Sequence, residues 1–143
     1  MTLRISSCVL ARIHTHCVSA YPEEGVGFLL GSKTGANREV SFVLPAGNAS
    51  EAAVRRTRFV IRPEETLNAE KVARQQKLDL LGVFHSHPDH PPFPSEFDRE
   101  SAIPWFIYLI TSIEKGKAGD TRVWRLSEDA SRFIEEVLTI TNN

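Results

Sequence analysis

The sequence predicts an α/β protein in which helices cover one mixed β-sheet. Strand-like and helix-like segments follow one another as strand, helix, several strands, helix, strand, helix and strands. This order is typical of a layered α/β architecture. The chain has 143 residues, which is enough to form one domain with its own hydrophobic core. We therefore expect residues 1–143 to form a single α/β domain.

The first half is expected to contain a strand, a helix and three further strands. Residues 3–5 form a short strand, and Ser6 or Ser7 can cap the following helix. Apolar residues at helical spacing continue to about Ala20, and Tyr21-Pro22 ends the helix. Three strands are expected over residues 25–30, 39–44 and 57–61, with a polar loop or flexible hairpin from Ala46 to Arg56 before the last of them.

The second half begins with a helix that has Pro63 in its first turn. Leu67, Val72 and Ala73 give this helix a thin apolar stripe. Residues 80–87 read as a buried strand, and a short helix is expected from about Ser95. The remaining strands are expected over residues 105–110, the most apolar and central, and 121–126, whereas residues 132–140 fit a strand or a helix.

Composition excludes several classes of protein. The net charge of −1 and the pI near 6.5 give no bulk electrostatic case for nucleic acid or an anionic membrane. No apolar run is as long as a membrane span, and the N-terminus lacks a signal-peptide pattern, so we expect a cytoplasmic protein. The two cysteines, Cys8 and Cys17, are expected to be small apolar residues of the first helix.

The strongest candidate site is the stretch His85-Ser86-His87-Pro88, which ends a predicted buried strand. Alternate residues of a strand point to the same face, so His85 and His87 lie on one side, roughly 6.5 Å apart along the strand. That separation lets both imidazoles reach one metal ion. Pro88 then ends the strand because it has no N–H for the ladder.

A carboxylate from the next helix can complete this site. Ser95 is a good N-cap, and Asp98 follows in the first turn. A helix that starts there returns Asp98 to the two histidines. Two histidines and one carboxylate leave a fourth tetrahedral position open, as a catalytic zinc ion requires.

Three further histidines are weaker candidates for metal ligands. His90 lies on the loop after the strand and is either an alternative ligand or a residue at the rim of the site. His14 and His16 are two positions apart on a helix, so they face different directions and are expected to lie on its polar face.

The run from His85 to Asp98 resembles the His-x-His, seven residues, Ser-x-x-Asp signature of the JAMM (MPN+) zinc metalloproteases. The stretch Tyr21-Pro22-Glu23-Glu24-Gly25-Val26-Gly27-Phe28-Leu29-Leu30-Gly31 is similar to the family's early glutamate motif. The resemblance covers most of the chain and is closest to the compact prokaryotic, stand-alone type. It implies a cytidine-deaminase-like fold, with a curved sheet between two long helices, and it selects Glu24 over Glu23 as the catalytic glutamate.

The resemblance also implies an activity. Zn²⁺ on His85, His87 and Asp98 would lower the pKa of a water to roughly 7. Glu24 would accept the proton of that water, and Ser95 would stabilise the oxyanion. The implied substrate is a ubiquitin-like or sulfur-carrier protein, cleaved after its C-terminal Gly-Gly tail, and the loop Ala46 to Arg56 corresponds to the segment with which the family holds that tail.

Three alternative functions compete with this hypothesis. The first is a non-catalytic scaffold of the same fold, and the complete motif argues against it. The second is an archaeal deubiquitinase linked to the proteasome. The third is a zinc deaminase, but its His-x-Glu and Pro-Cys-x-x-Cys motifs are missing.

Overall fold

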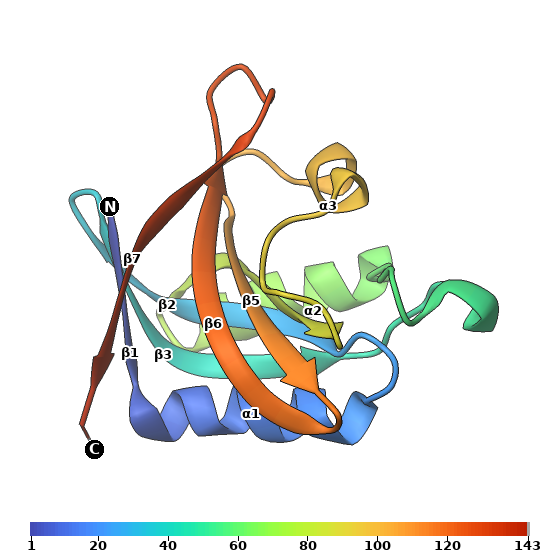
Figure 1. The fold of residues 1–143 in the computed structure, drawn as a ribbon. Coiled ribbons are helices and arrows are strands. Elements are labelled where there is room, and N and C mark those ends of the chain that lie inside the picture. The colour runs from blue at the N-terminus through green and yellow to red at the C-terminus, as the bar shows by residue number, and fades with distance from the viewer. Residues whose placement is uncertain (143) are drawn as a thin grey trace.

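The computed structural model describes residues 1–142 and contains one seven-stranded sheet and three α-helices (Figure 1). Hydrogen-bonded neighbours follow the order β1-β3-β2-β4-β5-β6-β7 around a closed barrel. The elements are β1 (Thr2–Ser6), α1 (Ser7–Ala20), β2 (Val26–Thr34), β3 (Asn37–Ala46), a 3-10 turn η1 (Ala52–Val54), α2 (Pro63–Gln75), β4 (Asp79–Pro88), α3 (Glu96–Ser101), β5 (Ile107–Glu114), β6 (Lys117–Leu126) and β7 (Phe133–Thr141).

The predicted α/β class and mixed sheet are confirmed, but the sheet is more than a curved layer. β1 pairs in parallel with both β3 and β7, and this double pairing closes the sheet on itself. β4 and β5 are also parallel, while the other neighbours are antiparallel. Residues 132–140, which fit a strand or a helix from the sequence, correspond to the strand β7. This segment is a strand because it pairs with β6 on one side and with β1 on the other, which closes the barrel.

The two long helices lie on opposite faces of the central strands. Leu10, Ile13 and Cys17 of α1 pack into one buried cluster together with residues of β1, β3 and β4. Ala69 and Ala73 of α2 pack into a second cluster with Phe28 of β2 and Tyr108 of β5. The central strands β2, β4 and β5 thus have apolar side chains on both faces.

Three local expectations are wrong. Residues 57–61 do not form a strand, because Val60 donates its N–H to the Asn48 side chain instead of to a neighbouring strand. Leu67 is 66% exposed, and the buried face of α2 consists of Ala69 and Ala73. Trp105 lies outside β5 with a φ of 59° and is 82% exposed.

Both histidines of α1 contact the sheet instead of lying on a free polar face. His14 Nε2 is 3.1 Å from Thr121 Oγ1, and His16 Nε2 donates to the Val26 carbonyl at 3.1 Å. They bond to different strands, as expected for residues that point in different directions. Cys17 is buried and Cys8 is exposed, so only Cys17 is the core residue that was expected.

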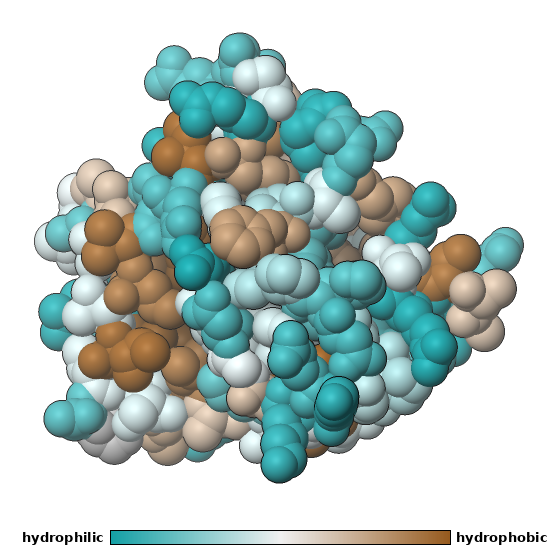
Figure 2. Space-filling model, viewed as in Figure 1, coloured by the Kyte–Doolittle hydropathy of each residue, from teal (hydrophilic) through white to brown (hydrophobic). Residues whose placement is uncertain are grey.

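The surface is mostly hydrophilic in the view of Figure 2, with one larger apolar group over β1 and β7. Val137 and Ile140 of β7 are exposed. Among residues 1–142, no helix has the length and apolar character needed to cross a membrane.

Candidate active site

β4 places His85 and His87 at the centre of the sheet. The strand is antiparallel to β2 and parallel to β5, with His85 opposite Val26 and His87 opposite Ser112. His85 is fully buried and His87 is 7% exposed. An apolar strand that is covered on both faces therefore holds two imidazoles almost completely out of water, and Pro88 ends it as expected.

α3 brings Asp98 to the same place through its cap. The Ser95 Oγ accepts a hydrogen bond from the Asp98 N–H at 3.0 Å, and Asp98 Oδ2 accepts one from the Ser95 N–H at 2.9 Å. This reciprocal capping box fixes the Asp98 side chain in the first turn. The helix therefore begins at the residue that the sequence indicated.

The three side chains converge on one point. Asp98 Oδ2 lies 3.2 Å from His87 Nε2 and 3.4 Å from His85 Nε2. One ligand atom from each residue lies within 4.8 Å of the others, and this is the group of metal-ligating side chains found in the described chain. The set of two imidazoles and one carboxylate is the one expected for a catalytic zinc ion.

The hydrogen bonds around the imidazoles leave nitrogen lone pairs available for a metal. His87 Nδ1 lies 2.9 Å from the Pro91 carbonyl, which can only accept, so Nδ1 carries the proton and Nε2 has a free lone pair. Neither ring nitrogen of His85 has a hydrogen-bond partner within residues 1–142. A buried, unpartnered imidazole is costly unless it has a ligand. The residues present therefore fit a zinc ion.

Burial and charge set the protonation of the acidic groups. Burial alone would raise the pKa of Asp98, but His85, His87 and the Ser95 N–H together hold it well below its usual range. Burial lowers the pKa of His85 and favours its neutral, metal-binding form. Burial, with the charge of Asp98 as a smaller cause, raises the pKa of Glu24 to about 9.

Glu24 is fixed between the turn before β2 and the long loop that follows β3. Its N–H donates to the Arg55 carbonyl at 2.8 Å, and the Asn48 side chain donates to its carbonyl at 3.2 Å. The next residue, Gly25, donates to the Ser86 hydroxyl at 2.8 Å. Glu24 is 4% exposed, its Oε1 has no hydrogen-bond partner within residues 1–142, and it lines one cavity with His87 and Ser95.

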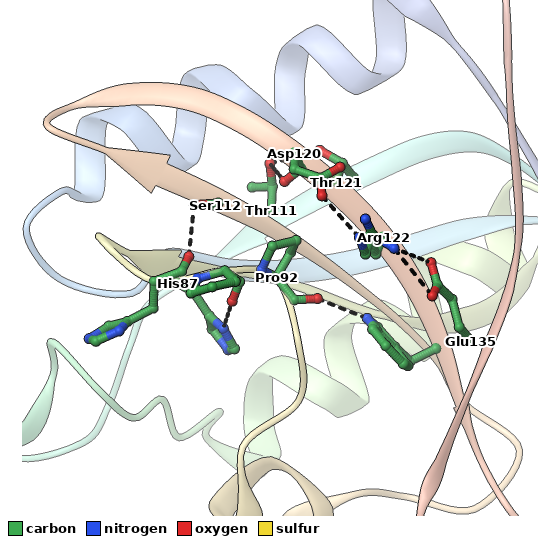
Figure 3. A network of polar contacts seen from close by, with 11 residues as sticks. His87, Pro92, Thr111, Ser112, Asp120, Thr121, Arg122 and Glu135 are labelled. Carbon is green, nitrogen blue, oxygen red and sulfur yellow. Dashed lines mark hydrogen bonds and ion pairs between the residues drawn. The ribbon is translucent and has the colours of Figure 1, made fainter.

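The proline-rich loop between β4 and α3 is held by side chains of the sheet (Figure 3). Three successive carbonyls each accept a hydrogen bond from a side chain of the sheet: His90 from Ser112 Oγ at 2.7 Å, Pro91 from His87 Nδ1 at 2.9 Å, and Pro92 from Trp124 Nε1 at 3.0 Å. The Pro91 carbonyl also accepts the Phe93 N–H at 2.9 Å. Sequence reasoning missed Ser112 and Trp124. The available signal was the run of prolines, whose carbonyls cannot be satisfied by a regular ladder and need other donors.

The remaining candidates lie at the edge of the site. His90 is exposed and lines the cavity that contains Glu24, so the structure places it at the rim and outside the group of three ligands. The loop from Ala46 to Arg56 projects from the body at the right of Figure 1, and its base returns to Glu24. A second cavity of about 240 Å³ reaches His85 and Asp98 from the side of α2 and is lined mainly by apolar residues.

Comparison with known proteins agrees with this geometry. The Prok-JAB profile, described as prokaryotic homologs of the JAB domain, matches residues 6–127. A desampylase of Pyrococcus furiosus is 35% identical over 113 residues, covering 78% of this chain and 72% of that protein. A probable TtuB-protein conjugate cleaving protease of Thermus thermophilus is 31% identical over 111 residues, covering 76% of this chain and 70% of that protein.

Solved structures show the same fold. A protein of Desulfitobacterium hafniense gives a TM-score of 0.86 at 29% identity, covering 99% of this chain and 94% of that one. A protein of Salinibacter ruber gives a TM-score of 0.75 at 36% identity, covering 96% and 90%. The chain therefore belongs to the prokaryotic JAB family of JAMM proteins, and the enzyme class expected from the sequence, a JAMM-type isopeptidase, is confirmed.

Proposed function

We propose that this chain is a zinc-dependent isopeptidase that cleaves directly after the C-terminal Gly-Gly tail of a ubiquitin-like or sulfur-carrier protein. The observation that carries the proposal is the convergence of His85, His87 and Asp98 beside the buried, unpartnered oxygen of Glu24. The names of the relatives, desampylases and a TtuB-protein conjugate cleaving protease, point to conjugates of small modifier proteins as the substrate class.

His85, His87 and Asp98 would hold the zinc ion. When bound there, zinc supplies a Lewis acid and lowers the pKa of a coordinated water to roughly 7. Glu24 sits where it can accept the proton of the attacking water and return it to the leaving amine as the C–N bond breaks.

Ser95 has two compatible roles. Its oxygen accepts the Asp98 N–H, which caps α3. Its hydroxyl hydrogen is not used in that bond and can donate to the oxyanion that forms on the substrate carbonyl.

The narrowness of the site supports a glycine tail. Glu24, His85, His87 and Asp98 are each at most 7% exposed. Phe59 packs on His85 with ring centroids 4.6 Å apart, and Arg58 lies 4.7 Å from the centre of the Phe97 ring, so side chains of the long loop and α3 meet beside the ligands. A residue without a Cβ can bring its carbonyl into so restricted a space.

The loop from Ala46 to Arg56 remains the proposed holder of the tail. An extended tail can pair with exposed backbone of this segment, in the manner of an added strand. Ala52 and Ala53 start the projecting 3-10 turn and are exposed, so their backbone is open to a partner.

The test is a panel of ubiquitin-like substrates with glycine, alanine or leucine before the cut. We expect fast cleavage after Gly-Gly, much slower cleavage after alanine or leucine, complete loss of activity with a chelator, and recovery with added zinc. Equal rates for the three tails would exclude the Gly-Gly specificity, and full activity of a verified metal-free sample would exclude the zinc mechanism.

A further inference from the structure

The segment that frames the active site is strongly basic. Residues 46–62 contain four arginines and one acidic residue, Glu51, whereas the whole chain has 18 acidic and 17 basic residues. The four arginines, Arg55, Arg56, Arg58 and Arg62, are called the arginine rim below. The positive charge is therefore concentrated on one segment of a chain that is close to neutral overall.

The rim arginines are not neutralised by carboxylates of the same chain. No salt bridge in the described chain involves any of the four, whereas four other arginines pair with glutamate or aspartate, namely Arg4, Arg99, Arg122 and Arg125. Arg56, Arg58 and Arg62 are exposed. Arg55 is half-buried and donates to the Ser50 carbonyl at 2.8 Å, which holds the loop in shape.

Three of the four rim arginines lie directly beside groups of the active site. The Arg55 carbonyl accepts the Glu24 N–H, and Arg56 lines the cavity that contains Glu24 and Ser95. Arg58 rests on the ring of Phe97, the residue before Asp98. A guanidinium on an aromatic face is held in place while its edges stay available for hydrogen bonds.

Three carboxylates near the rim have partners other than the rim arginines. Asp89 accepts the Tyr21 hydroxyl and the Lys115 N–H, each at 2.8 Å. Glu96 is paired with Arg99. Glu65, near Arg62, accepts the Gly47 N–H at 3.2 Å. The charge of Arg56 is close enough to contribute to the lowered pKa of Asp89. None of these three carboxylates forms an ion pair with a rim arginine in the described chain, so the exposed guanidinium groups remain open to an external anion.

We propose that the arginine rim docks an acidic face on the folded body of the protein substrate, and this inference rests on the proposed isopeptidase function. A carboxylate-rich surface that approaches the rim places the attached tail next to Glu24. A complementary charge beside the site raises the rate of productive encounter and is sensitive to salt. Nucleic acid would also meet the positive charge, but it would cover the entrance without presenting an amide bond, so an acidic protein surface is the better occupant.

The test compares two versions of one ubiquitin-like domain that end in the same Gly-Gly-linked fluorescent amine. One version has an acidic surface, and in the other version the surface carboxylates are replaced by amides. Between about 0.1 and 1 M NaCl the Debye length falls from about 10 to about 3 Å. We expect kcat/KM for the acidic version to fall by about tenfold or more over this range, and that for the neutral version to change much less.

Charge-reversal variants locate the effect. Arg56→Glu and Arg62→Glu should each reduce the preference for the acidic version over the neutral one, by about tenfold in the double variant. The matched controls are Arg12→Glu on α1 and Lys33→Glu near the β2–β3 hairpin, which lies on the opposite side of the molecule from the projecting loop (Figure 1). These controls should keep the preference, and circular dichroism and zinc content should be unchanged in all five variants.

Binding separates this inference from the proposed function. Fluorescence anisotropy with the Glu24→Gln protein measures the affinity for each version without cleavage. Docking is supported if the protein binds the acidic version more tightly than the neutral one and if the double rim variant loses this difference. This result would support docking even if the wild-type protein cleaves neither version. Equal affinities for the two versions, or the same salt response in the rim variants as in wild type, would overturn the inference. So would tighter binding of an oligonucleotide that the acidic version cannot displace.

Discussion

Glu24, the proposed catalytic base, is buried, and its Oε1 has no hydrogen-bond partner in the described chain. Glu24→Gln keeps the size of the side chain but cannot accept a proton. We expect unchanged zinc content and a loss of activity of about 10²- to 10⁴-fold. Glu23→Gln is the matched control and should retain activity. If Glu23 is the sensitive position, the assignment of the two glutamates is reversed.

The pKa of Glu24 also predicts how the stability of the metal-free protein depends on pH. The pKa is raised from 4.5 to about 9, so between these values Glu24 ionises in the unfolded chain but stays protonated in the folded one. The contribution of Glu24 to the free energy of unfolding is therefore fully present below pH 4.5 and is lost as the pH rises towards 9.

Glu24→Gln removes this titration. Urea denaturation of the metal-free proteins should give equal free energies of unfolding near pH 4. At pH 7 the variant should be more stable by about 1–3 kcal/mol, since one pKa unit corresponds to about 1.4 kcal/mol. A difference that does not vary between pH 4 and pH 8 would show that Glu24 ionises normally in the fold.

Ser95 can be tested for its two roles separately. Ser95→Ala removes the helix cap and the hydroxyl donor, whereas Ser95→Gly removes the donor but costs only a few tenths of a kcal/mol as a cap. We expect the Ala variant to lose about 1 kcal/mol of stability, and both variants to lose about 10²- to 10³-fold in kcat. A rate loss that follows the stability loss across the two variants would leave Ser95 as a cap alone.

At the scale of elements, the active site depends on how the proline-rich loop is held. Trp124 donates to the Pro92 carbonyl from β6, and removing this donor frees the segment that leads to Ser95 and Asp98. We expect Trp124→Phe to weaken zinc binding about tenfold, measured by competition with a chelator, as is typical for groups that support metal ligands. Trp105→Phe changes an exposed tryptophan outside any strand and should leave zinc affinity unchanged. Equal affinities in the two variants would mean that the other two loop hydrogen bonds suffice.

The elements that could be predicted have local signals. β4 is an apolar run that ends at a proline, and α3 begins at a serine followed three positions later by an aspartate. Residues 57–61 carry the same kind of apolar, β-branched composition as a strand. Their hydrogen-bond partners include the side chain of Asn48 and the N–H of Ala49, and composition does not encode these partners.

Within the site, too, features with a local sequence signal could be predicted, and features that depend on distant residues could not. The spacing of His85, His87 and Asp98 was sufficient to expect that they meet, because each lies on a short, regular element. Ser112 and Trp124 support the loop from positions 22 and 32 residues away from their acceptors, so only the folded sheet brings them there. The closure of the sheet through β1 and β7 was missed for the same reason, since strand pairing between distant segments leaves no local pattern.

At the scale of the whole molecule, two of the proposed zinc ligands belong to the central strand β4 and the third belongs to the short helix α3. A zinc ion bound there would join β4 to α3 in the folded state only. Saturating zinc should therefore raise the unfolding free energy of the metal-free protein, by about 2.7 kcal/mol at a hundred times Kd, and raise Tm in calorimetry. His87→Gln should lose most of this increase. An equal rise in Tm for the variant would place the stabilising ion elsewhere.

The parallel pairing of β1 with β7 has a consequence for the protein during its synthesis. β3 covers one edge of β1 soon after the helix α1 is made, but the other edge stays open until residues 137–141 have been added. An open strand edge can accept a strand from another chain. The last strand therefore protects the growing protein from aggregation. A chain that stopped before residue 137 would still contain the strands of the active site, β2 and β4, but would expose the N-terminal strand to its neighbours.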